Sequence, residues 1–326
     1  MIRYLLSRLA WAVPIVLAIL VINFLIIHLV PGDPIQALVG DFPAPPGYAE
    51  QVRKEFGLDQ PILVQLGLYL SNLAQGNLGF SFANRQPVIG LLVDRSLVTL
   101  MLMLPALTLA AGLGIVLALA AAPRAGSLWD SSITATSLVG YSVPIFWLGQ
   151  ILVIVFAIKL QWLPAQGMIT MREQYEGWAR LKDILWHLVL PGFSVTIYYL
   201  AVVARVTRAS VLEAMAQDWV LTARAKGLTR REVLWRHILP NALIPVATVI
   251  GYNFGYSLTG AIMVETVFAW PGLGQLFITS IGNRDYPVLQ GIFLFTAVVV
   301  VLANVATDVL YAFLDPRVRQ HYERKG

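Results

Sequence analysis

Six stretches of the chain, each at least 17 residues long, contain no Asp, Glu, Lys or Arg. A helix that crosses the ~30 Å hydrocarbon core of a bilayer needs about 17–25 mostly apolar residues. The pattern therefore predicts six transmembrane helices, over Leu9–Val30, Leu97–Ala122, Ile133–Ile158, Leu188–Ala204, Leu239–Val264 and Val288–Thr307.

The composition supports an all-α integral membrane protein. Hydrophobic residues make up 58% of the chain and charged residues only 13%, whereas soluble domains are about half apolar and a quarter charged. The absence of Cys excludes disulfides, thiolate metal sites and Cys nucleophiles. The first apolar stretch is too long for the core of a signal peptide and lacks a small-residue cleavage site. We therefore expect an uncleaved first helix.

The distribution of basic residues predicts the orientation. With the N-terminus inside, the cytoplasmic segments hold 14 of the 23 Lys and Arg residues, and short cytoplasmic loops are enriched in these residues. Six spans then place both termini in the cytoplasm, an N-in/C-in arrangement. The net charge of +5 thus reports topology, and we expect no nucleic-acid partner.

The six spans divide the chain into four parts. We predict a first transmembrane helix at 1–30, an outer insertion at 31–95, a membrane core at 96–314 with a basic cytoplasmic loop at 205–238, and a cytoplasmic tail at 315–326. Within the insertion, Tyr48–Phe56 and Ile62–Leu73 are predicted to form short helices.

The sequence contains no motif for catalysis or for a cofactor. Serine-hydrolase, zinc-protease, dinucleotide and phosphate-loop motifs are all absent. The four His residues are far apart in sequence, which makes a His metal site improbable. We expect no catalytic, cofactor-binding or metal-binding residues. If transport is driven by ATP, another chain must hydrolyse it.

The basic loop has the pattern of a rigid helical hairpin. Asp218 is predicted to cap a short helix over Trp219–Lys226, and Gly227 follows where a positive φ is common. Thr229 and Glu232 form a capping box that begins a second helix. Two interpretations are open on these features: a docking element for a partner, or an amphipathic helix held on anionic lipid by Arg and Lys.

The hairpin resembles a known family. Thr222–Leu228, which reads Thr-Ala-Arg-Ala-Lys-Gly-Leu, and Asn241–Pro245 are similar to the dipeptide/oligopeptide/nickel branch of ABC importer permeases. The chain departs from the general permease motif at Leu221, Thr222 and His237. Further similar blocks follow in order along the chain: Met1–Tyr4, Pro31–Pro34, Gly76–Gly79, Val264–Gly274, Arg284–Gly291 and Leu314–Arg317.

This resemblance implies a type I ABC importer permease in a bacterial or archaeal inner membrane. Such a subunit forms half of a pore for di- or oligopeptides and is not an enzyme. The implied partners are a second homologous permease, two ATP-binding subunits, an extracytoplasmic substrate-binding protein and membrane lipid. The implied ATPase-docking residues on the coupling helix are Trp219, Leu221, Ala223, Arg224, Lys226, Gly227 and Leu228.

Other functions stay open at this point. The same family carries nickel chelates, glutathione or oligosaccharides. A self-contained channel or secondary transporter would show inverted repeats and ionisable groups near the midplane, and the sequence shows neither.

Four residues are candidates for a gate or pore: Asn253, Gly255, Glu265 and Asp308. Gly251 and Gly255 give the fifth span a small-residue face, suited to a partner permease, a pore lining or packing within the chain. Glu265 and Trp270 flank the outer end of this span. The resemblance favours a gate or receptor-facing role there, the alternative being a structural turn with Trp270 as an interfacial anchor.

Overall fold

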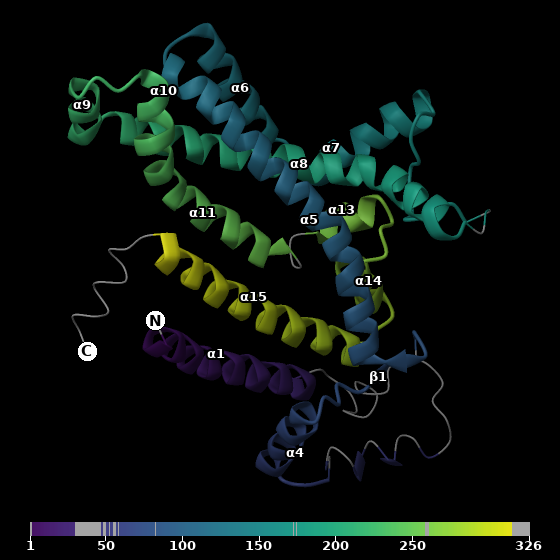
Figure 1. Cartoon of the computed structure of the whole chain (residues 1–326). Coiled ribbons are helices and arrows are strands. Elements are labelled where there is room, and N and C mark those ends of the chain that lie inside the picture. Colours follow the sequence, from purple (N-terminus) through teal and green to yellow (C-terminus); the bar gives the residue numbers. More distant parts are fainter. Residues whose placement is uncertain are drawn as a thin grey trace. The chain divides into compact units, whose positions relative to one another are not determined.

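The structure is a computed structural model that describes residues 2–29, 47, 50, 51, 53, 54, 57, 59–81, 83–171, 173, 175–257 and 261–314. These residues are mostly helical (Figure 1). The helices from the N-terminus are α1 (Ile2–Leu29), α4 (Ile62–Ala74), α5 (Val88–Ala121), η1 (Ala122–Arg124), α6 (Leu128–Ser142), α7 (Ile145–Leu152), the π-helix η2 (Val153–Lys159), α8 (Gly177–Met215), α9 (Asp218–Ala225), α10 (Arg230–Val233), the π-helix η3 (Leu234–Ile238), α11 (Leu239–Gly255), α13 (Ile262–Val267), α14 (Leu273–Gly282) and α15 (Tyr286–Leu314). A two-residue strand pair, β1 (Phe80–Ser81) and β2 (Gln86–Pro87), precedes α5.

Among the described residues, four helical segments are long and apolar enough to cross a membrane: Val88–Arg124, Gly177–Met215, Arg230–Gly255 and Tyr286–Thr307. A fifth candidate is the bent pair formed by Leu128–Ser142 and Ile145–Lys159. The predicted first span coincides with α1, whose described apolar stretch, Val13–Leu25, is shorter. A multi-span helical membrane fold is confirmed, whereas the number of six spans stays a prediction.

The third predicted span is not one straight helix. It breaks between Ser142 and Ile145 with a bend of 96°. Pro144 explains the break, because proline has no amide hydrogen and disfavours helical backbone in the residue before it. Val143 is accordingly extended, with φ −77° and ψ 124°.

Two other boundaries differ from the sequence prediction. The helix predicted to run to Val264 ends at Gly255, and the chain continues in the separate helix α13. The fourth span is 39 residues long and reaches Met215. Arg205 and Arg208, assigned to the cytoplasmic loop, therefore lie inside α8. A span that is defined by hydrophobicity ends at the first charged residue, whereas the backbone hydrogen bonds of a helix continue past that residue.

The chain forms two compact units. One comprises the described parts of Met101–Ser257 and Ala303–Gly326. Its central helix is α8, which contacts both α6 and α11. At the carboxyl end of α8, where α9 and α10 lie (Figure 1), a hydrophobic cluster joins η1, α8, α9, α10, η3 and α11. We call it the hairpin cluster; its buried members are Ala122, Val211, Ala214, Val220, Ala223, Val233, Ile238 and Ala242.

The other unit comprises the described parts of Ile2–Leu100 and Leu258–Leu302. Its core joins the start of α5 to α14 and to the start of α15, through Val88, Leu91, Leu92, Leu273, Leu276, Val288 and Ile292. Helix α4, predicted over Ile62–Leu73, is confirmed, and Tyr69 on it contacts Phe24 of α1. The short helix predicted over Tyr48–Phe56 lies largely outside the described residues.

Candidate functional site

The predicted helical hairpin is present. Helix α9 begins within three residues of the end of α8 and turns its apolar side onto the hairpin cluster. Val220 and Ala223 are both buried there. Because these side chains contact α8 and η1 of the same unit, α9 is fixed to the end of a long membrane helix.

The carboxyl end of α9 has the hydrogen bonds of a Schellman motif. The amide of Gly227 donates to the carbonyl of Arg224 (2.9 Å), and the amide of Leu228 donates to that of Ala223 (3.4 Å). Gly227 has a φ of +82°, as predicted. Leu228 also packs against the hairpin cluster, of which Ala223 is a member, and an apolar contact commonly accompanies this motif. The end of α9 is thus set by one glycine.

The second helix of the hairpin begins with the predicted capping box. The amide of Glu232 donates to the Thr229 hydroxyl (3.3 Å), and the amide of Thr229 donates to the Glu232 carboxylate (2.9 Å). This helix then continues through the π-helix η3 into α11. The widened turn ends two residues before Pro240, whose missing amide hydrogen leaves the regular pattern of bonds incomplete. The hairpin is therefore continuous with two candidate spans.

The start of α9 differs from the prediction. Asp218 is the first residue of the helix and not its cap. The residue in the cap position is Gln217, which makes no side-chain capping bond. An acidic residue in the first turn still interacts favourably with the helix dipole, which explains why the local sequence resembles a cap.

The face of α9 that points away from the cluster is exposed. Leu221 is 71% exposed, an unusual state for a leucine, and Arg224 and Lys226 are exposed beside it. Of the other residues predicted to dock, Trp219 and Leu228 are half-buried against the cluster. Ala223 is 5% exposed because it packs inside the hairpin cluster, so its side chain is not available to a partner. One large apolar and two cationic side chains thus face outward, together with Asp218, Thr222 and Ala225.

The second candidate region surrounds Glu265, which is fully buried. Its carboxylate accepts hydrogen bonds from the Thr99 hydroxyl (2.6 Å) and from the amides of Gly274 (2.7 Å) and Gln275 (3.1 Å). These amides belong to the first turn of α14, where a negative charge is favoured. Burial raises the pKa of Glu265, although the hydroxyl and the two amides act in the opposite direction. Glu265 therefore ties α13, α5 and α14 together.

The turn between α13 and α14 is closely packed on this carboxylate. A Cβ atom added to Gly272 would clash with the Glu265 carboxylate, so only glycine fits. Trp270 is fully buried and donates to the carbonyl of Val98 (2.9 Å). The expectation that Trp270 is an interfacial anchor is wrong. Arg95 donates to the carbonyl of Pro271 (2.8 Å). These contacts favour the structural turn over a gate.

The small-residue face of α11 packs within the chain. A Cβ atom on Gly255 would lie 2.7 Å from the Cβ of Ala303, and one on Gly251 would lie 2.8 Å from Thr307. Both partners are on α15. Close packing against α15 therefore accounts for both glycines. The amide nitrogen of Asn253 is buried without a hydrogen-bond partner among the described residues. Asp308 is on α15, but its side chain lies outside the described residues.

Two residues of these sites were not predicted from the sequence. Val220 holds α9 in place, and its burial could have been inferred from its spacing of three residues from Ala223. Thr99 both accepts from the amide of Leu273 (2.9 Å) and donates to Glu265. No local pattern connects a threonine in one helix with a glutamate 166 residues away.

Comparison with known proteins identifies the family. Residues 111–320 match the family described as binding-protein-dependent transport system inner membrane component, and residues 1–103 match the N-terminal family of the same systems. The chain is 38% identical to the di/tripeptide transport system permease protein DppB of Pseudomonas aeruginosa, over 98% of this chain and 99% of that protein. It is 40% identical to a putative peptide transport system permease protein of Brucella abortus (96% and 98% covered).

A further relative is the dipeptide transport system permease protein DppB of Escherichia coli K12, at 36% identity, with 98% of this chain and 99% of that protein covered. A solved amino acid ABC transporter matches 73% of this chain and 94% of its own at 17% identity, with a TM-score of 0.45. That structural likeness is too distant to assign details of the fold. The two family matches and the nearly full-length relatives show that this multi-pass membrane protein belongs to the family of inner membrane components of binding-protein-dependent transport systems.

Proposed function

We propose that this chain is the permease subunit of an ATP-driven peptide importer and forms half of its translocation pore. The relatives that it matches over nearly their whole length are named as dipeptide, di/tripeptide or peptide permeases. An extracytoplasmic binding protein delivers the peptide, and a second permease completes the pore. The alternative cargoes, which are nickel chelates, glutathione and oligosaccharides, have no support among these names.

The energy comes from two ATPase subunits, one of which docks on α9 of this chain. The observation that carries this proposal is the outward face of Leu221, Arg224 and Lys226 on a helix that Val220 and Ala223 fix to the end of α8. A lipid anchor would insert several apolar side chains into the bilayer, but Leu221 is the one large apolar side chain on α9 that is classed as exposed. A small mixed patch on a fixed helix is better suited to a protein cleft.

The proposed topology has six spans with both termini in the cytoplasm. The first span is α1 and the third is the bent α6–α7 pair. Together with the four long helices these give an even number. This arrangement places α9 and α10 on the cytoplasmic side with the ATPases, and the turn around Glu265 at the outer end. A self-contained channel would need neither partner nor docking face.

Co-purification tests the docking proposal. Leu221→Asp removes the apolar centre of the outward face without altering the buried side of α9. The expected result is loss of most of the bound ATPases at normal abundance of the permease. Leu63→Asp is the matched control, because Leu63 is 79% exposed on α4. If both variants retain the ATPases equally, α9 is not their docking site.

Transport measurements test the substrate. The complete importer in proteoliposomes should take up a labelled dipeptide only with ATP and the binding protein. Dipeptide uptake without any ATPase subunit would contradict the proposal and favour a self-contained transporter.

A further inference from the structure

One arginine and three tyrosines form a continuous line of contacts across α6 and α8, and two further tyrosines pair at the end of α11. Arg205 lies 4.7 Å above the ring of Tyr141, and Tyr141 stacks on Tyr198 at 5.6 Å. Tyr198 contacts Tyr199, with 5.2 Å between the ring centroids. The separate pair is Tyr252 and Tyr256, whose ring centroids are 4.4 Å apart. We call these residues the tyrosine ribbon; it contains five of the chain's 12 tyrosines.

The part of the ribbon on α6 and α8 lies in the interior of the spans, whereas Tyr252 and Tyr256 are at the end of α11. Tyr198 and Tyr199 are near the middle of the 39-residue helix α8, and Arg205 is about 15 Å from its carboxyl end at 1.5 Å per residue. Tyr141, Tyr252 and Arg205 are nevertheless exposed. Tyrosine and arginine are unsuited to contact with hydrocarbon at such depth, and charged residues there usually face a water-filled path. The ribbon therefore indicates a polar surface inside the membrane core.

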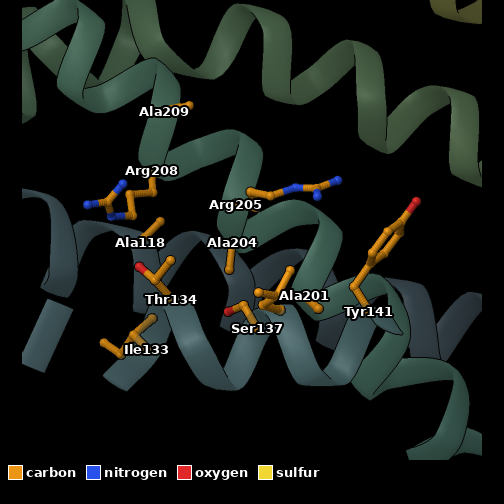
Figure 2. A pocket seen from close by; sticks show the side chains of 11 residues that line it. Ala118, Ile133, Thr134, Ser137, Tyr141, Ala201, Ala204, Arg205, Arg208 and Ala209 are labelled. Atoms are coloured by element: carbon orange, nitrogen blue, oxygen red, sulfur yellow. The ribbon is translucent and has the colours of Figure 1, made fainter. Parts of the chain in front are cut away.

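A cleft of about 170 Å³ adjoins the arginine end of the ribbon (Figure 2). Helices α5, α6 and α8 line it mainly with small and apolar side chains, among them Ala118, Ile133 and Ala201. Figure 2 shows Arg205 and Tyr141 toward one end of the cleft and Arg208 toward the other. An apolar space of this size accommodates a single ligand side chain, since pockets for whole drug-sized ligands measure about 300–1,000 Å³.

The two arginines at the cleft differ in their charge balance. Arg208 donates two hydrogen bonds to the carboxylate of Asp130, at 2.6 and 2.7 Å, so its charge is neutralised. Arg205 has its contact with Tyr141, and within the part of the chain that the structure describes no carboxylate forms a salt bridge with it. The cleft therefore has one uncompensated positive charge beside an apolar space. A free carboxylate with an adjacent apolar side chain is complementary to both.

We propose that Arg205 and the tyrosine ribbon bind the peptide during its passage. The guanidinium of Arg205 binds the C-terminal carboxylate, the cleft receives the C-terminal side chain, and the tyrosine rings contact the remainder of the peptide. This proposal rests on the proposed function in peptide import. It assigns to the permease a selection for free C-termini that is separate from the selection made by the binding protein.

Photolabelling tests the site directly. The probe is alanyl-photoleucine, a dipeptide with a diazirine side chain of about the size of leucine, applied to the assembled importer and to its Arg205→Gln variant. We expect the probe to label α6 and α8 at the cleft lining. Labelling by the C-terminal amide of the probe should be about tenfold weaker, because the amide loses the charge-assisted hydrogen bond between the carboxylate and Arg205. In Arg205→Gln the acid and the amide should label equally. If the probe labels other positions of the wild-type importer, the assignment is wrong. It is also wrong if the acid and amide forms of the probe label the wild type equally.

Uptake by the reconstituted importer separates this inference from the function on which it rests. Arg205→Gln should lower alanyl-leucine uptake about tenfold while binding-protein-stimulated ATP hydrolysis continues, and Arg205→Lys should retain more uptake. A purely structural role would instead reduce assembly and ATP hydrolysis together. If wild-type importer takes up no peptide, the proposed function fails. If it does and Arg205→Gln equals it, the proposed function stands and this inference is wrong. If Arg205→Gln does not assemble, the comparison of acid and amide labelling in the wild-type importer still tests this inference.

Discussion

Substitution of Gly227 by valine tests whether the orientation of α9 is needed for ATPase recruitment. Gly227 has a φ of +82° and ends α9 through the Schellman motif. A Cβ atom there would meet no atom within 4 Å. The cost of valine is therefore conformational and not a clash, about 1–2 kcal/mol for left-handed backbone.

This cost corresponds to a change of about 5- to 30-fold in the equilibrium between the native and a relaxed turn. It acts on the loop, whereas the spans keep their own packing. We expect Gly227→Val to insert normally, to recover few ATPases on purification and to lose transport. Gly227→Asn should be milder, because asparagine adopts this conformation more readily.

The matched control is Gly76→Val. Gly76 follows α4 with a φ of +78°, no atom within 4 Å of an added Cβ, and the same pair of bonds, from Gly76 to Leu73 and from Asn77 to Asn72. The strain is the same, but it lies in another helix. Membrane abundance, ATPase co-purification and dipeptide uptake are measured for both variants. Normal recovery and uptake with Gly227→Val, or equal ATPase loss with Gly76→Val, would refute the reasoning.

Three other outcomes are expected. Single cysteines at Gln51 and Arg231 should react from opposite sides of the membrane, position 51 with an impermeant reagent in intact cells and position 231 only after lysis; the reverse would invert the proposed topology. Glu265→Gln should destabilise the protein by about 1–3 kcal/mol, because an amide cannot accept from all three donors that the carboxylate satisfies. A thermal unfolding temperature equal to that of the wild type would show that these bonds are dispensable. Gly255→Leu should reduce folded yield through its clash with Ala303, and unchanged yield would argue for an open face on α11.

The sequence predicted those elements that depend on local chemistry. The capping box at Thr229, the glycine end at Gly227 and helix α4 each depend on residues within one or two turns. The apolar stretches likewise predicted a multi-span helical fold, because a bilayer leaves a hydrophobic chain few alternatives. The family resemblance was then confirmed by matches over nearly the whole chain.

The remainder depended on contacts between distant segments. Glu265 was a gate candidate because it flanks the outer end of an apolar run, yet Thr99 and the first turn of α14 enclose it. Trp270 is of a residue type that often anchors helices at a membrane interface, but its side chain is fully buried. Arg205 appeared to end a span, whereas the backbone of α8 continues beyond it. In each case a residue's environment is set by partners that its neighbours in sequence do not reveal.

The length of α8 has a mechanical consequence. Thirty-nine residues at 1.5 Å each make a rod of about 58 Å. A tilt of only about 5° about one end of such a rod moves the other end by roughly 5 Å, close to one helical pitch. Since α9 is packed on the final turns of α8, small angular changes at either end become displacements the size of a side chain at the other. By thermodynamic reciprocity, a ligand that favours one tilt also changes the affinity of whatever binds the opposite end.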